Sequence, residues 1–465
     1  MASAYLSRTI GTPTNAKKWT ISFWVKLMKT PANSYDLIHS GASGSDEVLL
    51  HRYESDGTVS SKEDDTSGGG TTWGLYGDRK FRDFNGWQHW VHAFDSTQST
   101  AADRYKVYIN GVNRRNNNET FATDQTVPLN FESNINTSGQ TLNIGKRTFD
   151  TANYFDGQLA HVHFIDGTQY DASTFGETDS STGIWKPKTA PSVTYGNNGF
   201  FLKFDNSANM GLDSSGEGNN LTVNGTILQS KDTPTNIYPV LNQADNAAAT
   251  TFGLQNFGTT LGTGGGSGDY GLRSTLAANS GKWYAEFKFN YSGDGGNVIS
   301  IADMDVRLQI NMGSSSPRAG HWGIQRYNDS KTNLYNNGSF ISQNTAMWGG
   351  FTSSDVISIA LDIGAGKIFF GKNGVYKDSS GNTGDPVNGT YPTFSGLTTD
   401  GSKYYGFFTE NRANIANGTL CNFGLGFFGT TAVSSAGSNG NGSVFEYDVP
   451  SGYYALNTEN LGAQS

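Results

Sequence analysis

Short runs of alternating apolar and polar residues, separated by turn residues, follow one another along almost the whole chain. The clearest lies at 87–112. Its first run, 87–94, is rich in aromatic residues, and its second run, 104–109, alternates strictly, so both are expected to be β-strands. Asn110 and Gly111 come next, and this pair best tolerates the positive φ angles of a type I′ turn. The segment therefore predicts a β-hairpin.

The same pattern returns in the second half of the chain, at 355–376. A strand ends at Asp362, a short Gly-rich turn follows, and a second strand leads to Asn373 and Gly374. Two copies of one hairpin pattern, far apart in one chain, predict two related domains.

Other alternating runs predict further strands, at 19–27, 37–40, 48–53, 141–146, 155–165, 200–204 and 281–287. In the first of these, alternation places Trp19, Ile21, Phe23 and Val25 on one face and Trp24 on the other. In 155–165 it places Leu159, His161 and His163 opposite Ala160, Val162 and Phe164. The polar stretch 55–72 is expected to be a long loop, and long loops on a rigid scaffold often bind ligands.

Composition favours an all-β fold. Glycine supplies 60 of the 465 residues, as many tight turns require, and aromatic residues supply 13%, which is enough apolar area to build cores. We predict two tandem antiparallel β-sandwiches of the jelly-roll type. The predicted boundaries are 1–205 for the first sandwich, 206–245 for a linker and closing segment, and 246–465 for the second sandwich.

Charge and apolar runs exclude some partners. The formal net charge is −9 and no basic patch or tail stands out, so nucleic acid is not an expected partner. No apolar run reaches the length of about 18 residues that spans a membrane, and no signal segment begins the chain. We therefore expect a protein made in the cytoplasm, without membrane insertion. Cys421 is the single cysteine, so no internal disulfide is possible, and its apolar surroundings indicate a core position.

Two groups of aromatic and polar residues are candidates for ligand binding. In the first half, Trp73, Tyr76 and Arg79 follow the polar stretch, and a flat aromatic ring beside polar donors is a common way to hold a sugar. In the second half, the candidates are expected on loops, and they are Tyr327, Tyr335, Asn336 and Trp348. Core packing is the alternative for the aromatic members of both groups.

Several ordered motifs of the first half resemble laminin-G-like domains of the concanavalin A-like lectin superfamily. They are WTISFWVKL at 19–27, Trp87-x-His89 leading into KVYINGV, LNIGKR, and YFDGQLAHVHFIDG. The resemblance covers about residues 1–175 and implies two curved antiparallel sheets. The calcium site that is common in the family is not visible here, so the sequence leaves metal binding open.

The second half resembles a SPRY domain, a curved two-sheet sandwich that binds proteins. The motifs are GKWYAEF, HWGIQ, DVISIALDIGAGKIFFGKNGVY, YP and NFG. Tandem units of these two kinds, with a linker like DTPTNIYP and an ending like VPSGYYALNTENL, are similar to virion proteins of tailed bacteriophages.

Catalytic and metal-binding patterns are incomplete in this sequence. Glucanases of the concanavalin A-like class place Glu-x-Asp-x-Glu on one strand, whereas here Glu446 and Asp448 are followed by Pro450 in place of the third carboxylate. Asp303 and Asp305 share a strand face, either as solvated strand-end residues or as a divalent-ion site. His161 and His163 lack a third ligand, and the Gly-rich stretch 262–268 lacks the lysine and helix of a phosphate loop.

These observations predict a non-enzymatic protein on the surface of a phage virion. It is expected to be a tail-fibre-type adhesin or a capsid decoration protein (head fibre) that binds other virion proteins and host surface glycans. The sequence does not separate placement on the tail from placement on the head. It shows no heptad repeat and no long N-terminal anchor of the kind that a free-standing fibre needs. We expect the protein to need no cofactor. We also expect it to be displayed on the particle in several copies, and a homotrimer is one such arrangement. The alternative is a polysaccharide-cleaving enzyme of the glucanase type, which the missing carboxylate disfavours.

Overall fold

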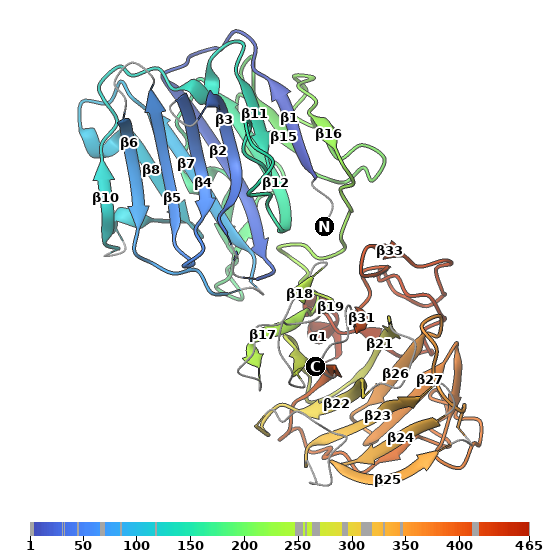
Figure 1. Cartoon of the computed structure of the whole chain (residues 1–465). Coiled ribbons are helices and arrows are strands. Elements are labelled where there is room, and N and C mark those ends of the chain that lie inside the picture. The colour runs from blue at the N-terminus through green and yellow to red at the C-terminus, as the bar shows by residue number, and fades with distance from the viewer. Residues whose placement is uncertain are drawn as a thin grey trace. The chain divides into compact units, whose positions relative to one another are not determined.

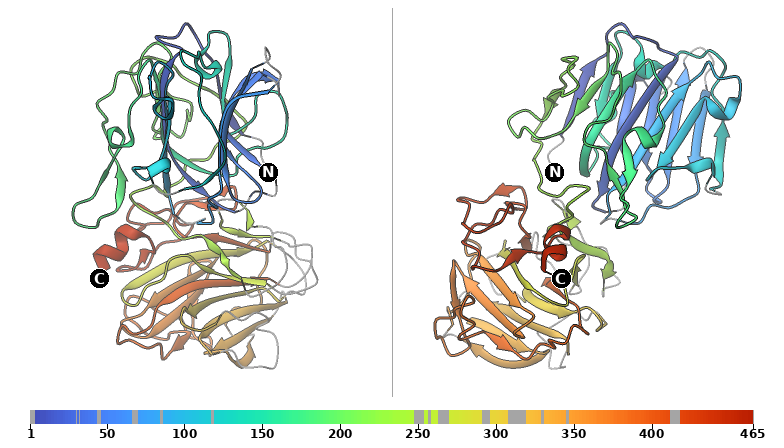
Figure 2. Two further views of the ribbon diagram at one scale, coloured as in Figure 1. Left: turned by 90° about the vertical axis from the view of Figure 1, so that its left-hand side faces the viewer. Right: turned by 180° about the vertical axis from the view of Figure 1, so that it is seen from behind.

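Antiparallel β-strands make up most of the regular structure, so the predicted all-β fold class is confirmed. The computed structural model describes residues 4–29, 31, 33–43, 46–65, 70–83, 86–116, 119–246, 254–255, 258–262, 270–290, 296–307, 319–328, 331–344, 347–411 and 418–464. The chain divides into a first unit, Met1–Gln229, and a second unit, Ser230–Ser465. Figures 1 and 2 show the strands of both units in chain order by colour.

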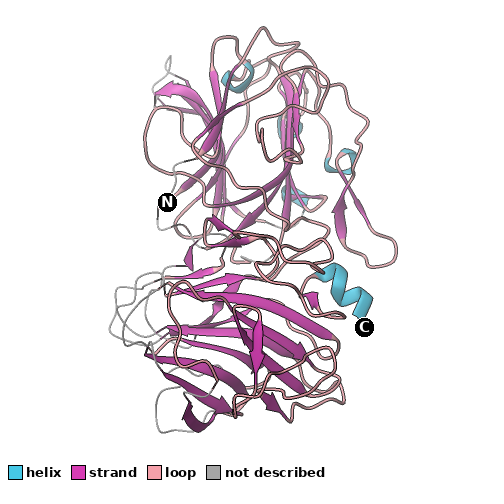
Figure 3. Cartoon of the chain, turned by 90° about the vertical axis from the view of Figure 1, so that its right-hand side faces the viewer, coloured by secondary structure: helices cyan, strands magenta, loops and turns pink. Residues whose placement is uncertain are grey.

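Two antiparallel sheets pack face to face in the first unit (Figure 3). The larger sheet consists, in spatial order, of β10 (Phe121–Gln125), β6 (Gly70–Gly77), β5 (Val59–Asp65), β4 (Asp46–Tyr53), β3 (Tyr35–Ser43), β11 (Thr141–Ile144), β1 (Tyr5–Thr9) and β16 (Thr222–Asn224). The smaller sheet consists of β15 (Phe200–Leu202), β12 (Gly157–Asp166), β2 (Lys18–Leu27), β7 (Gln88–Asp95), β8 (Tyr105–Ile109) and β9 (Val112–Asn113). Short 3-10 turns lie between strands, at Ala101–Asp103, Arg114–Asn116, Asn134–Asn136 and Ala172–Thr174.

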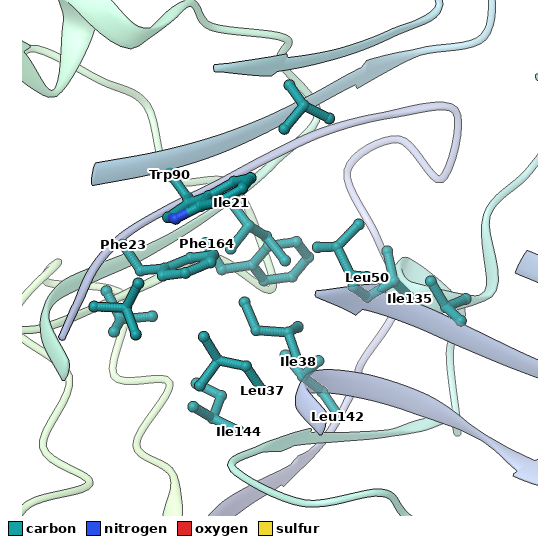
Figure 4. Packing of buried hydrophobic residues seen from close by; sticks show 14 of the residues in the cluster. Ile21, Phe23, Leu37, Ile38, Leu50, Trp90, Ile135, Leu142, Ile144 and Phe164 are labelled. Carbon is teal, nitrogen blue, oxygen red and sulfur yellow. The ribbon is translucent and has the colours of Figure 1, made fainter. Parts of the chain in front are cut away.

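The core of the first unit lies between these two sheets. Figure 4 shows Ile21, Phe23, Trp90 and Phe164 of the smaller sheet packed with aliphatic side chains of the larger sheet. The expected face of β2 is therefore the core face, because alternate residues along a strand point to the same side. Leu202 belongs to this core and Phe204 packs against it.

Trp24 points to the opposite side of the smaller sheet, yet it is also buried. A second layer covers this side: its short hairpin pairs β13 (Gly176–Thr178) with β14 (Trp185–Pro187), and a separate apolar cluster joins Phe175 to Val91. The tryptophan ring stacks on the ring of His89, with centroids 4.8 Å apart. A sheet that is buried on both faces accounts for a strand with apolar residues on both sides.

The strict alternation expected along 155–165 is wrong, because β12 contains a β-bulge. The register with β2 shifts between Ala160 and His163, and the backbone of His161 has a φ of 48°. The extra residue reverses the alternation beyond it. Leu159 therefore shares the core side with Val162 and Phe164, whereas His163 faces the outer layer and stacks on Phe201, with centroids 3.9 Å apart.

The expected long loop at 55–72 is also wrong, because β5 occupies its centre and pairs with β4 and β6. Val59 fills the core, and Glu63 is buried with its own partners. Its carboxylate accepts hydrogen bonds from Trp73 Nε1 at 3.0 Å and Ser133 Oγ at 2.8 Å. A polar residue can occupy a buried strand when its hydrogen bonds are made, which conceals the strand from a search for apolar periodicity.

The hairpin predictions are confirmed in both units. β7 and β8 pair with each other, and Asn110 and Gly111 have φ angles of 47° and 83°. In the second unit β26 (Ile357–Asp362) pairs with β27 (Lys367–Lys372), and Asn373 and Gly374 have φ angles of 50° and 80°.

The second unit also contains two main antiparallel sheets. One sheet consists, in spatial order, of β17 (Leu241–Asn246), β20 (Tyr270–Ser274), β30 (Tyr405–Asn411), β22 (Val298–Asp303), β23 (His321–Asn328), β24 (Lys331–Asn336) and β25 (Ser339–Asn344). The other consists of β18 (Leu254–Gln255), β19 (Thr260–Leu261), β31 (Thr419–Asn422), β21 (Lys282–Phe289), β26, β27 and β28 (Val375–Lys377), with β29 (Phe394–Ser395) beside β27 and β34 (Tyr454–Ala455) beside β21. A short hairpin pairs β32 (Phe427–Phe428) with β33 (Thr431–Ala432), and α1 (Thr458–Gln464) ends the described chain.

The second unit has a core of its own. Trp283, Phe287 and Ile359 of one sheet pack with Ile301 and Phe407 of the other. Cys421 is fully buried in the same cluster, as predicted.

The linker predicted at 206–245 is ordered in part by the first unit. β16 pairs with β1, and Leu221 is buried in the first core. No helix in the described ranges is long and apolar enough to cross a membrane.

Candidate binding site on the first unit

A small open cavity lies where the chain crosses from the larger to the smaller sheet of the first unit. Its volume is about 240 Å³. The connection between β6 and β7 forms one side, and the ends of β7 and β8 form the other. The residues that line it are Arg79, Lys80, Phe81, Arg82, Asp83, Trp87, Gln88, Ile109 and Asn110.

Phe81 anchors this connection to the core. The Phe81 amide donates to the Gly57 carbonyl at 2.7 Å, and its ring meets Trp90 edge to face, with centroids 5.0 Å apart. Only 5% of the residue is exposed. Arg79 places its guanidinium over this ring, with its Cζ atom 5.2 Å from the centroid. Stacking occupies a face of the guanidinium and leaves its N–H donors, which lie in the plane, able to bind a ligand.

Two side-chain amides that line the cavity use their oxygen atoms, and not their NH₂ groups, for hydrogen bonds within the protein. The Asn110 Oδ1 accepts from the His89 amide at 2.8 Å, and the Gln88 Oε1 accepts from Trp90 Nε1 at 3.2 Å. Because both partners are donors only, the oxygen of each amide must face them and the NH₂ group must face elsewhere. The cavity is therefore rich in hydrogen-bond donors.

The charge at the cavity is positive. Three cationic side chains, Arg79, Lys80 and Arg82, are accompanied by the carboxylate of Asp83. Lys80 Nζ lies 3.7 Å from Asp56 Oδ2, and both side chains are about half exposed. Water screens an ion pair of this kind, so it contributes little to stability. Across the described residues, neither arginine has a carboxylate partner. A site of this kind attracts acceptor-rich or anionic groups.

The other two candidates of the first half lie outside this cavity. Trp73 is 0% exposed in the core, where it packs against Tyr105, with ring centroids 4.6 Å apart. It presents no face to a sugar, so the core alternative holds for this residue. Tyr76 is half-buried on β6 and does not line the cavity.

The four candidates of the second half do not assemble into a loop platform. Tyr327 lies in β23, and Tyr335 and Asn336 lie in β24, so their expected loop positions are wrong. Tyr335 is 3% exposed and its hydroxyl donates to Gln325 Oε1 at 2.8 Å. Trp348 is half-buried and packs against Phe351, with ring centroids 5.7 Å apart. The pairing of β23 with β24 therefore takes up the ring of Tyr335, and this pairing is not visible in the local sequence.

Ser22 and His89 have the spacing of a nucleophile and its base, but the wrong tautomer. Ser22 Oγ lies 2.8 Å from His89 Nε2, and Trp185 Nε1 donates to His89 Nδ1 at 3.0 Å. An indole nitrogen can only donate, so Nδ1 is the acceptor and Nε2 carries the proton. Burial, followed by the charge of His161, lowers the pKa of His89 to about 3. The ring therefore donates to the serine and cannot take its proton at neutral pH.

The carboxylates singled out in the sequence serve as turn and ion-pair residues. Glu446 binds the amide and hydroxyl of Ser434, and Asp448 accepts from the Ser438 amide at 2.6 Å. Neither residue lies on a strand.

A lysine lies between the other two aspartates. Lys403 Nζ is 3.3 Å from Asp303 and 3.1 Å from Asp305. His161 and His163 have separate roles in the bulge and the outer layer. No group of three or more metal-ligating side chains gathers in the part of the chain that the structure describes. The Gly-rich stretch 262–268 falls outside the described residues except for its first member.

Of the sequence candidates, Arg79 alone lines the cavity. Sequence reasoning missed Arg82, Gln88 and Asn110. The run of Arg79, Lys80 and Arg82 within four positions was the available signal, and it is too short to count as a basic patch. The sequence marks Asn110 only as a turn residue, although its side chain also lines the cavity and accepts a hydrogen bond from the His89 amide.

Comparison with known proteins finds one family model that matches part of the first unit. The family described as "Concanavalin A-like lectin/glucanases superfamily" matches residues 2–172. No curated protein matches the chain.

Three solved structures are similar to parts of the chain. The SPRY domain of human HERC1 is 21% identical, with 39% of this chain and 96% of that chain covered and a TM-score of 0.28. A heptameric SAP-like pentraxin from Limulus polyphemus is 16% identical, with 48% and 89% covered and a TM-score of 0.27. Domains LG4-5 of the mouse laminin alpha1 chain are 9% identical, with 92% and 93% covered and a TM-score of 0.26. The family match covers residues 2–172, so this part of the first unit is similar to concanavalin A-like lectin/glucanase domains.

Proposed function

We propose that this chain is a non-enzymatic glycan-binding protein on the surface of a tailed-phage virion. The observation that carries the proposal is the donor-rich cavity of the first unit, which is lined by the anchored β6–β7 connection and by the ends of β7 and β8. A cavity of this kind holds a polar ligand through directed hydrogen bonds. The resemblance of the tandem units, the linker and the chain ending to phage virion proteins supports the proposed location and the proposed binding of other virion proteins.

The arrangement of acidic residues supports binding without turnover. Glycoside hydrolysis needs two carboxyl groups on either side of the scissile bond. The cavity has the single carboxylate of Asp83, whose Oδ1 accepts from the Gly86 amide at 2.9 Å. Glu446 and Asp448, which form the partial match to the glucanase motif, lie in the second unit and accept hydrogen bonds from the backbone amides of Ser434 and Ser438.

The size of the cavity supports display in several copies. A volume of about 240 Å³ is below the ~300 Å³ at which pockets for drug-sized ligands begin, so one sugar ring or its substituent fits. Such contacts give a Kd on the order of 1 mM. Repetition on one particle raises avidity by about 10² to 10⁴, and a homotrimer is one arrangement that supplies it.

The test compares monomeric and artificially multimerised full-length protein on an array of host surface polysaccharides. We expect binding by the multimer and no release of reducing sugar from the same polysaccharides. The monomer serves as the control for avidity. Sustained sugar release would establish the glucanase alternative, and absence of binding by the multimer would reduce the role to a purely structural one. Labelling the protein on intact particles distinguishes head from tail placement.

A further inference from the structure

The cavity of the first unit has the chemistry of an oxyanion site. Two guanidinium groups, those of Arg79 and Arg82, line it without a carboxylate partner in the described chain. Two amide NH₂ groups, from Gln88 and Asn110, are turned away from the donors that their own oxygens bind. A neutral sugar carries hydroxyl groups that both donate and accept, whereas a carboxylate or sulfate only accepts. The carboxylate of Asp83 also lines the cavity, and its Oδ1 accepts from the Gly86 amide. Donors outnumber this one carboxylate, so the lining matches an oxyanion better than a hydroxyl group.

Part of this site is already ordered before a ligand arrives. Arg79 rests on the Phe81 ring, and that ring is held by Trp90 and by a backbone hydrogen bond to Gly57. Asn110 is held by the hairpin turn and by the His89 amide. A donor that is already oriented loses less conformational entropy on binding, so a single anionic group can be held by few contacts.

We propose that this cavity selects glycans whose sugar residues carry an oxyanion, either a carboxylate or a sulfate. This inference rests on the proposed function. Arg79 and Arg82 bind the anionic group, and the amides of Gln88 and Asn110 bind the neighbouring ring oxygens. The cavity lining carries more positive than negative side chains, whereas the chain as a whole carries a net charge of −9.

The test immobilises the full-length protein as a multimer and measures binding of four probes by interferometry. The probes are polygalacturonate oligomers, dextran sulfate, neutral dextran and single-stranded oligo-dT, each at low and at raised salt. We expect binding of one or both anionic polysaccharides, weakened by salt because exposed charges are screened. Preference between the first two probes identifies the oxyanion.

Variants assign the binding to this cavity. Arg79→Gln and Arg82→Gln should each weaken binding of the anionic polysaccharide by about tenfold, because each removes charge-assisted hydrogen bonds. The matched control is Arg115→Gln, which removes the same charge from a guanidinium of this unit that pairs with Asp124 outside the cavity. This control should bind as the parent does. Unchanged melting curves confirm that each variant is folded.

The outcomes separate this inference from the proposed function. Equal binding of neutral dextran, or anionic binding that survives both arginine substitutions, overturns the oxyanion site and leaves glycan binding standing. Stronger binding of oligo-dT overturns the choice of a glycan. If neither these probes nor any polysaccharide on the array binds, both the inference and the proposed function fail.

Discussion

At the scale of single residues, Gly111 meets two separate structural demands. Its φ of 83° lies in the left-handed region, and a Cβ atom at this position would lie 2.7 Å from the ring of Trp185. Gly111→Ala should therefore lower the free energy of unfolding of the first unit by about 2 to 3 kcal/mol, from backbone strain and from the clash. Chemical denaturation of the full-length protein measures this loss.

Gly216 supplies the matched control for this prediction. It has a similar φ of 95°, but nothing lies within 4 Å of the position that a Cβ atom would take. Gly216→Ala should cost only the strain, about 1 kcal/mol. Equal losses in the two variants would show that Trp185 does not pack against the hairpin turn.

At the scale of elements, strand β21 holds a distant segment through one buried carboxylate. Glu286 accepts hydrogen bonds from the amides of Glu446 at 2.7 Å and Tyr447 at 2.8 Å, and from the Tyr284 hydroxyl at 3.0 Å. Burial raises the pKa of Glu286 to about 7, although these hydrogen bonds oppose the rise. The folded state therefore keeps a proton that the unfolded state loses near pH 4.5.

This raised pKa predicts the sign of a pH effect on the second unit. The contribution of Glu286 is fully present below pH 4.5 and is lost as the pH rises through about 7. Between these values the free energy of unfolding should fall by up to about 1.4 kcal/mol per pH unit. Glu286→Gln cannot titrate, so its denaturation midpoint should lack this decline. Glu217→Gln, an exposed carboxyl of the first unit, is the control. A decline that persists in Glu286→Gln assigns the effect to another group.

Some strands can be predicted from sequence periodicity and others cannot. The 87–112 and 355–376 hairpins are predictable because strand alternation and the Asn-Gly turn are local properties of the chain. The bulge in β12 is not, because the extra residue is accommodated by pairing with β2 and leaves no composition signal. Strand β5 escapes sequence prediction for a related reason, since its buried polar residues are satisfied by partners elsewhere in the chain.

At the scale of the whole molecule, each unit has its own core and should fold alone. We expect fragments 1–229 and 230–465 each to unfold cooperatively, because each core is closed by strands of its own unit. Circular dichroism during thermal unfolding tests both fragments. Non-cooperative melting of both would contradict this expectation.

The boundary that the sequence predicts at residue 205 provides a matched comparison. A fragment 1–205 lacks β16 and the core residue Leu221, and it also lacks Asn219, whose amide donates to the Gly199 carbonyl at 2.7 Å. It should melt at a lower temperature than 1–229. Equal melting temperatures would place 206–229 outside the folded unit.

The amino-acid sequence by itself determined the strongly alternating β-strands, the two Asn-Gly hairpins and the all-β class, because alternation and turn chemistry act between neighbours in the chain. Only the tertiary structure decided the site. It buried Trp73 and brought Arg79 to the end of a hairpin that lies about thirty residues further along, at Asn110. It also set the tautomer of His89 through Trp185. These outcomes depend on contacts between segments far apart in sequence, which no local pattern encodes.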